Sequence, residues 1–257
     1  MWRVLEISDI LLLIVDIRFP PLHFSPVFYD YCTKELKKDV ILVLNKIDLV
    51  PSSVVIAWKI FFENKFPNLH ILLFSSAKQI KQRRNKSNEA SEQSYSDNQA
   101  AIKALSAEIY TAKAHRELYE CVKKIVNSNV DLNSWAQLTE NMLRNCTSNM
   151  NASVFTDNLV PTNDDEAEMS ELFYSQKERK RYEHGYVTIG CCGFPNVGKS
   201  SLLNSLNGRK VVSVSRTPGH TKHLQTIFLT KNVRLCDCPG LVFPSLVEKP
   251  LQVCSCK

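Results

Sequence analysis

The chain has 257 residues, of which 44% are hydrophobic and 23% charged, a composition that is ordinary for a soluble protein. Its longest apolar run, residues 10–15, is too short to span a bilayer, and the N-terminus lacks the pattern of a secretory signal, so we expect no membrane partner. The nine cysteines do not repeat the spacing of a zinc ribbon or a disulfide framework, which favours free thiols in a reducing compartment. The net charge of +6 permits an acidic partner such as RNA without requiring one.

In chain order, short apolar runs rich in Val, Ile and Leu predict strands that are buried on both faces. They lie at residues 9–17, 39–45, 68–76, 186–193, 225–230 and 233–237. Helix-like segments lie between them, at about 54–64, 100–126 and 199–207. This alternation predicts an α/β fold with a mostly parallel sheet. Two polar stretches, 79–99 and 144–184, break the pattern and are predicted to be mobile insertions or linkers.

A glycine-rich loop follows the fourth predicted strand and fits the spacing Gly-x4-Gly-Lys-Ser, with Gly193, Gly198, Lys199 and Ser200 at the fixed positions. A helix pattern begins directly after it, which is the strand, loop and helix context that a phosphate-binding loop needs. Lys199 is predicted to reach the β and γ oxygens of a nucleotide, and the Ser200 hydroxyl to coordinate Mg²⁺. The predicted phosphate-side contacts are Asn196, Val197, Gly198, Lys199, Ser200 and Ser201.

The sequence Asn45-Lys46-Ile47-Asp48 follows the second predicted strand and is suited to reading guanine. Asp48 can accept hydrogen bonds from N1–H and the 2-amino group, donors that adenine lacks, while Asn45 can meet the far edge of the base and Lys46 can lie over the ring. A backbone N–H near Ala77 can donate to guanine O6. The predicted base-side contacts are Asn45, Lys46, Asp48, Ser76, Ala77 and Lys78.

A third group of motifs would sense the γ-phosphate and the metal. Asp237 ends the last predicted strand and can reach Mg²⁺ through water, and the Gly240 amide can contact a γ-phosphate. Thr221 is the predicted switch hydroxyl for Mg²⁺, with Thr217 as the alternative. The predicted metal set is therefore Ser200, Thr221 and Asp237.

The order of these motifs resembles that of circularly permuted GTPases, in which the base-reading motifs precede the phosphate-binding ones. The stretches WRVLEISDILLLIVDIRFP and GRKVVSVSRTPGHTKHLQTIFLT are similar to the guanine nucleotide-binding protein-like branch of that family, relatives of GTPases that act in ribosome assembly. The likeness covers most of residues 2–78 and 183–250. It implies a three-layer P-loop NTPase fold, a permuted Ras-like domain with a mostly parallel sheet.

The resemblance implies a single domain over residues 1–257. Residues 1–78 would be the base-reading half, 79–185 a helix with polar insertions, and 186–257 the phosphate-binding half. Few residues follow Gly240, whereas family members continue into a further helical region, so the chain is expected to be a fragment or a short isoform.

The implied activity is a GTP-to-GDP switch with Mg²⁺. Leu241 stands where Ras-type enzymes carry a water-orienting Gln, so slow hydrolysis is predicted. Asn196 resembles an asparagine that ligates K⁺ in some relatives, and a K⁺ ion there would stimulate hydrolysis. The predicted catalytic residues are Lys199, Thr221, Asn196 and Gly240.

Several readings of the partners and the reaction stay open. The resemblance implies a monomer in the nucleus, the nucleolus or the cytoplasm, with pre-ribosomal RNA or a ribosomal protein as its partner. The basic clusters 78–86 and 177–181 either contact RNA or are simply solvated. The alternatives are a GTP-binding scaffold with negligible hydrolysis and an ATP-using kinase or ATPase. Asp16 and Arg18 suggest only a strand-end salt bridge.

Overall fold

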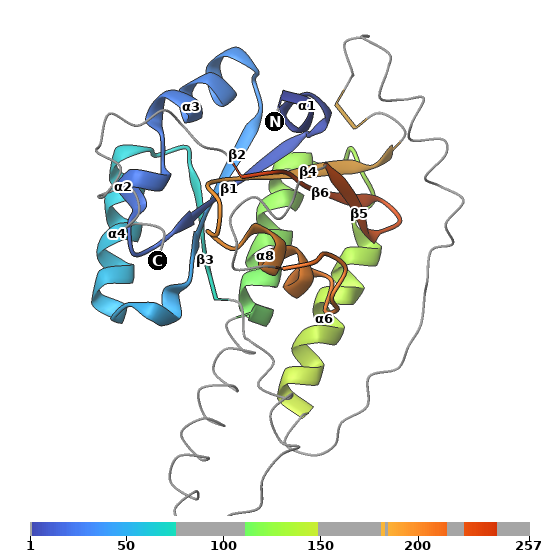
Figure 1. Cartoon of the computed structure of the whole chain (residues 1–257). Helices are drawn as coiled ribbons and strands as arrows, with labels where there is room; N and C mark the ends of the chain where they lie inside the picture. Colours follow the sequence, from blue (N-terminus) through green and yellow to red (C-terminus); the bar gives the residue numbers. More distant parts are fainter. Residues whose placement is uncertain (1, 76–110, 149–180, 183–184, 215–223, 241–257) are drawn as a thin grey trace, which may run out of the picture.

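The computed structural model describes residues 2–75, 111–148, 181–182, 185–214 and 224–240, and its centre is one six-stranded sheet (Figure 1). The strand order is β3-β2-β1-β4-β6-β5, with parallel pairing throughout except for the antiparallel pair β5 and β6. The strands are β1 (Ile10–Asp16), β2 (Asp39–Asn45), β3 (His70–Phe74), β4 (Val187–Cys192), β5 (Gln225–Thr230) and β6 (Val233–Asp237). The predicted mostly parallel sheet is confirmed, with each strand within two residues of its predicted ends.

The central strand β1 shows why these apolar runs form strands. All seven of its residues are buried, and alternate side chains enter opposite cores. Ile10, Leu12 and Ile14 lie in one hydrophobic cluster. Leu11, Leu13 and Val15 lie in the other. A run that is apolar at every position therefore reflects a strand covered by helices on both faces.

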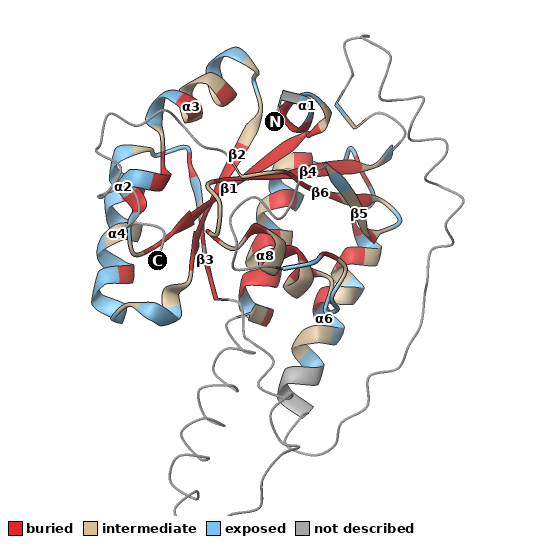
Figure 2. Cartoon of the chain, in the orientation of Figure 1, coloured by how far each residue is buried: buried red, intermediate tan, exposed pale blue. Residues whose placement is uncertain are grey.

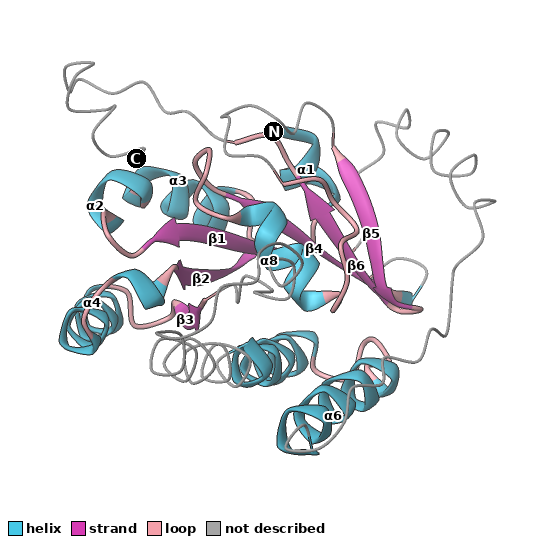
Figure 3. Ribbon diagram, turned by 60° about the horizontal axis from the view of Figure 1, so that its bottom comes forward, coloured by secondary structure: helices cyan, strands magenta, loops and turns pink. Residues whose placement is uncertain are grey.

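Helices cover both faces of the sheet and complete three layers (Figure 3). On one face lie the N-terminal helices and helical turns. They are α1 (Trp2–Ile7), α2 (Pro20–His23), α3 (Pro26–Asp30), the π-helix η1 (Tyr31–Glu35), the 3₁₀ turn η2 (Ile47–Leu49) and α4 (Ser52–Lys65). On the other face lie a helical segment over 111–126 and the helices α6 (Asn133–Ser148) and α8 (Lys199–Leu206).

Helix α6 corrects one expectation. The polar stretch 144–184 was predicted to be a mobile insertion, but residues 144–148 belong to this helix. The helix buries Trp135 completely, and the Asp131 carboxylate accepts a hydrogen bond of 2.9 Å from the Asn133 N–H at its start. The apolar spacing of Trp135, Leu138 and Met142 was a signal that could have identified the helix.

Burial follows the layers (Figure 2), with the central strands β1, β2 and β4 enclosed and the outer face of α4 exposed. From β1 the sheet continues outward through β2 to β3, and from β4 it continues through β6 to β5 on the other side. The order therefore reverses between β1 and β4, the place where parallel α/β sheets bind ligands at the carboxyl ends of their strands. Within the described residues, no helix is long and apolar enough to cross a membrane.

Candidate nucleotide-binding site

Four strand ends meet at the reversal point. Asp16 ends β1 directly beside Asn45, which ends β2. The loop that starts at Gly193 follows β4, and Asp237, which ends β6, pairs in register with Cys191. Residues that are remote in sequence are thereby brought to one edge of the sheet, because parallel strands present their carboxyl ends together.

The loop between β4 and α8 has the backbone shape of an anion-binding concavity. Asn196 and Gly198 both have left-handed backbone angles, with φ of 60° and 103°. Alternating conformations of this kind turn successive N–H groups toward one side, as in a phosphate-binding nest. A Cβ atom at Gly198 would overlap Nδ2 of Asn45, so this position requires glycine for its space as well as for its φ.

Lys199 is the first residue of α8, and only 7% of it is exposed. Its ammonium donates hydrogen bonds to the carbonyl oxygens of Gly193 at 3.1 Å and Phe194 at 2.8 Å. Burial lowers the pKa of Lys199, and the nearby Cys238 and Asp237 partly offset this effect. A buried ammonium held by neutral carbonyls gains much from a phosphate placed beside it, because little water competes for the charge.

Ser200 and Asp237 provide the oxygen atoms that a magnesium ion prefers. The Ser200 hydroxyl donates to Oδ2 of Asp237 at 2.8 Å. The other carboxylate oxygen, Oδ1, is buried and lacks a well-formed hydrogen bond within the described residues. The donor set thus fits Mg²⁺, which would be held by these two residues and, when bound, supplies positive charge to phosphate oxygens. Thr221 and its alternative Thr217 lie outside the described residues.

Burial of the charged Asp237 carboxylate lowers the stability of the fold at neutral pH. Burial raises its pKa, although Ser200 and Lys199 act in the opposite direction. A carboxyl whose pKa is raised in the fold contributes stability at low pH, and this contribution is lost as the pH rises through the raised value. We therefore expect Asp237→Asn to increase the free energy of unfolding of the nucleotide-free protein by about 1 kcal/mol at pH 7.

Urea denaturation of both proteins between pH 4 and pH 8 would measure this difference. The advantage of the variant should shrink toward the acid end of this range, because the wild-type carboxyl gains its proton as the pH falls. The same variant should bind GDP with little dependence on Mg²⁺. A variant that is less stable than wild type at pH 7 would contradict the electrostatic explanation.

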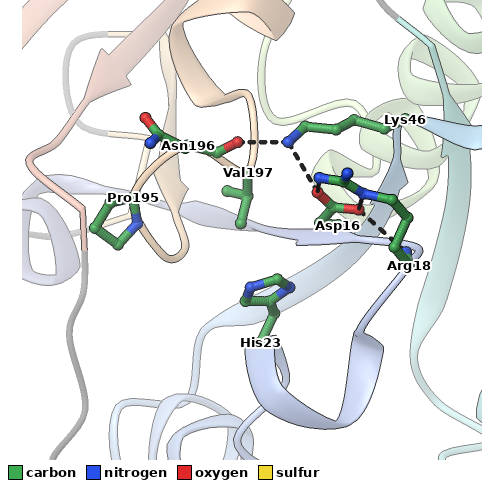
Figure 4. Close-up of a pocket in the computed structure, with 7 residues that line it drawn as sticks. All are labelled: Asp16, Arg18, His23, Lys46, Pro195, Asn196 and Val197. Carbon is green, nitrogen blue, oxygen red and sulfur yellow. Dashed lines mark hydrogen bonds and ion pairs between the residues drawn. The ribbon is translucent and has the colours of Figure 1, made fainter. Parts of the chain in front are cut away.

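The base-reading segment makes contacts that the sequence did not reveal. Nδ2 of Asn45 donates to the Val197 carbonyl at 2.6 Å, and Oδ1 of Asn45 accepts from the Lys46 N–H at 2.7 Å. The Lys46 ammonium donates to the Asn196 carbonyl at 2.6 Å and to Asp16 at 2.8 Å (Figure 4). Asn45 and Lys46 therefore join the base-reading and phosphate-binding segments. Their contacts with the base stay predictions.

Asp48 is exposed at the same edge of the sheet, and a neighbouring hydroxyl orients it. Oδ1 of Asp48 accepts a hydrogen bond of 2.6 Å from the hydroxyl of Ser75. The Ser75 carbonyl in turn accepts from the Thr111 hydroxyl at 3.1 Å. One of the two Asp48 carboxylate oxygens is thereby held in place by the end of β3, and its contact with the base stays a prediction. Ser76, Ala77 and Lys78 lie outside the described residues.

The predicted salt bridge at the end of β1 is confirmed, and it belongs to a larger network. Arg18 donates to both oxygens of the Asp16 carboxylate, at 3.0 Å and 2.7 Å. Burial raises the pKa of Asp16, but hydrogen bonds from Arg18 and Lys46 outweigh that effect and lower it to about 2. His23 lines the same small pocket, with its ring centroid 5.3 Å from that of Phe194.

Gly240 lies close to the loop between β4 and α8, and its contact with a γ-phosphate stays a prediction. A Cβ atom at this position would come within 2.7 Å of the Pro195 nitrogen, so the close approach requires glycine. Leu241, the residue in place of a water-orienting Gln, lies outside the described residues.

The sequence is similar to those of GTPases and of guanine nucleotide-binding proteins. Residues 188–253 match the family model described as 50S ribosome-binding GTPase. Guanine nucleotide-binding protein-like 1 from Rattus norvegicus is 43% identical over 263 residues, which cover 98% of this chain and 41% of that protein. The Homo sapiens protein of the same name is 43% identical over 259 residues, with the same coverage. Large subunit GTPase 1 homolog from Mus musculus is 30% identical over 282 residues, covering 99% of this chain and 43% of that protein.

Strand β2, which ends in the predicted base-reading motif, precedes the predicted phosphate-binding loop in the chain. Even so, β2 and β4 lie in one sheet, and Asn45 contacts Val197 of the loop directly. The chain resembles circularly permuted GTPases over almost its whole length. It spans about 41% of the length of the guanine nucleotide-binding protein-like relatives. A solved structure described as GDP-bound TM YlqF aligns with 97% of this chain and 60% of that one, at 14% identity and a TM-score of 0.42.

Proposed function

We propose that this chain binds GTP and GDP with Mg²⁺ and acts as a slow GTP-hydrolysing switch. The observation that carries the proposal is the contact between two motifs separated by about 150 positions. Asn45 and Lys46 donate to consecutive carbonyls, those of Val197 and Asn196, in the phosphate-binding loop. A segment suited to guanine and a segment suited to phosphate are thus held at a fixed spacing, as a nucleotide requires.

Each group would have a defined task. Asp48 would select guanine, Lys199 would bind the phosphates, and Ser200 with Asp237 would hold Mg²⁺. The N–H of Gly240 would respond to a γ-phosphate. The base would also contact Ser76, Ala77 and Lys78. The phosphates would also contact Val197, Gly198 and Ser201. The Thr221 hydroxyl would also bind Mg²⁺. We also propose one domain over residues 1–257, with its base-reading half at 1–78 and its phosphate-binding half at 186–257.

The biological role is proposed from the relatives. The names 50S ribosome-binding GTPase and Large subunit GTPase 1 homolog favour a ribosomal protein or a pre-ribosomal RNA as the partner. A monomer in the nucleus, the nucleolus or the cytoplasm fits that role. A GTP-binding scaffold without turnover is the second candidate, favoured by Leu241 in place of the water-orienting Gln.

Guanine selectivity tests the proposal directly. We expect the protein to bind GDP at least about 100-fold more tightly than ADP, because adenine leaves the Asp48 carboxylate unpaired. Asp48→Asn should weaken GDP binding by a similar factor. The variant should also bind XDP better than wild type does, since an amide N–H can donate to the additional carbonyl of xanthine. Isothermal titration calorimetry of both proteins with GDP, ADP and XDP measures these affinities.

The control is Glu63→Gln, which changes an exposed carboxylate on α4. It should leave every affinity unchanged. Equal binding of GDP and ADP by wild type would rule out guanine recognition, and binding of neither would rule out a nucleotide site in this chain.

Stimulation by K⁺ is the proposed route to hydrolysis without a glutamine. Asn196→Ala should abolish any increase in the single-turnover rate when Na⁺ is replaced by K⁺. Because Asn196 has φ of 60°, Asn196→Gly serves as a second variant that keeps the left-handed backbone. Both variants should retain GDP binding and lose the K⁺ effect. Stimulation that persists in both would exclude Asn196 as the ligand. Selective binding by wild type with no turnover in either salt would favour the scaffold.

A further inference from the structure

The Lys46 side chain contacts both the end of β1 and the loop between β4 and α8. Its own backbone is left-handed, with φ of 64°, and its ammonium bonds both to the Asp16 carboxylate and to the Asn196 carbonyl. The second contact is a charge-assisted hydrogen bond of 2.6 Å to a loop that also contains the predicted phosphate donors. The position of the Lys46 ammonium therefore affects the backbone of the phosphate-binding loop.

The geometry of the peptide group links the direction of the Asn196 carbonyl to that of the N–H of Val197. In a planar trans peptide the carbonyl oxygen and the following N–H point in opposite directions. A donor that fixes the Asn196 carbonyl therefore aims the N–H of Val197 away from Lys46. The Asn45 amide fixes the Val197 carbonyl at 2.6 Å and does the same for the N–H of Gly198. Two consecutive N–H groups are thus set toward the opposite side of the loop before any phosphate arrives.

Asp16 determines where the Lys46 ammonium can rest. Its side chain is 3% exposed, and one of its oxygens contacts both Lys46 and Arg18 at 2.8 Å and 2.7 Å. Arg18 holds the carboxylate through its Nε and Nη2 atoms and its backbone N–H (Figure 4). Without the carboxylate, two cations would share this pocket and repel each other. Lys46 would then leave the Asn196 carbonyl for solvent.

We propose that Asp16 is a positioning residue for the phosphate-binding loop, acting through Lys46 on the Asn196 carbonyl so that the Val197 N–H is aimed at the nucleotide phosphates. This inference rests on the proposed binding of guanine nucleotide. It adds a role for a residue that precedes both the base-reading and the phosphate-binding motifs in the chain. It also explains why the end of β1 carries a buried carboxylate in a strand that is otherwise apolar.

A double-mutant cycle tests the pathway. GDP affinity is measured by calorimetry, well below the melting temperature, for wild type, Asp16→Asn, Lys46→Met and the double variant. We expect Asp16→Asn to weaken GDP binding about tenfold, the loss of one charge-assisted hydrogen bond at the loop. In the Lys46→Met background, Asp16→Asn should cause no further loss. Independent effects that multiply in the double variant, or an Asp16→Asn affinity equal to wild type, would overturn the inference.

A spectroscopic readout separates positioning from stability. The ³¹P chemical shift of the β-phosphate in bound GDP should move in Asp16→Asn and in Lys46→Met by similar amounts. Asp39→Asn is the matched control, because it breaks the exposed ion pair with Arg181 on the surface and should change neither the shift nor the affinity. Lys46→Met leaves Asp16 and Arg18 paired, so it keeps the test informative if Asp16→Asn does not fold. An unchanged β-phosphate shift in Lys46→Met would overturn the inference.

The experiment distinguishes failure of this inference from failure of the proposed function. A wild-type protein that does not bind GDP overturns the proposed function, and the inference with it. A wild-type protein that binds GDP while Asp16→Asn binds equally well overturns only the role of Asp16.

Discussion

Replacing Lys199 with methionine should reduce GDP and GTP affinity by at least about 100-fold without unfolding the protein. Lys199 is 7% exposed, and its ammonium donates hydrogen bonds to the carbonyls of Gly193 and Phe194. Its charge is therefore poorly compensated until a phosphate is present, which is why burial lowers its pKa. A methionine of similar length would fill the space and remove the buried charge. We expect the free energy of unfolding without nucleotide to stay equal or to rise.

Two measurements together test this prediction. Calorimetry gives the nucleotide affinities, and urea denaturation without nucleotide gives the stability. Lys210→Met, which changes an exposed lysine beyond the end of α8, should alter neither quantity. GDP affinity within tenfold of wild type would show that Lys199 is not the main phosphate ligand. A large fall in stability would show that its role is structural.

Replacing Gly198 with alanine should destabilise the protein by about 3 kcal/mol and also weaken nucleotide binding. Two costs combine at this position. The backbone angle φ of 103° is unfavourable for any residue with a Cβ atom, and that atom would overlap Nδ2 of Asn45. Asn45 is 1% exposed, so moving its amide breaks the hydrogen bond to the Val197 carbonyl and leaves a polar group buried.

A second glycine provides the control. Gly185 also has a positive φ, of 75°, but a Cβ atom there meets nothing within 4 Å in the described structure. Gly185→Ala should therefore show only the backbone strain, about 1 kcal/mol. Urea denaturation compares the two variants, and the difference measures the contact with Asn45. Equal destabilisation by both substitutions would show that the close packing of Gly198 against Asn45 contributes nothing.

Local patterns in the sequence determined the layers of the fold and the chemical type of the site. Runs such as residues 10–16 are apolar at every position, which only a strand covered on both faces requires. The loop from Gly193 to Ser200 carries its own signal, because glycine, lysine and a hydroxyl are needed at fixed spacing around a phosphate. Helix α6 was missed because it joins the polar stretch that follows it without a composition break, although its apolar residues recur at helical spacing.

Only the tertiary structure decided which atoms of the site act on one another. The sequence predicted that Asn45 and Lys46 contact a base, and the structure adds hydrogen bonds from both to carbonyls about 150 positions further along the chain. Asp16 suggested a local pair with Arg18, and the parallel register of β1 with β2 adds Lys46 to that pair. Residue spacing describes neighbours along the chain, whereas hydrogen bonds of less than 3 Å depend on strand order and register, which long-range packing sets.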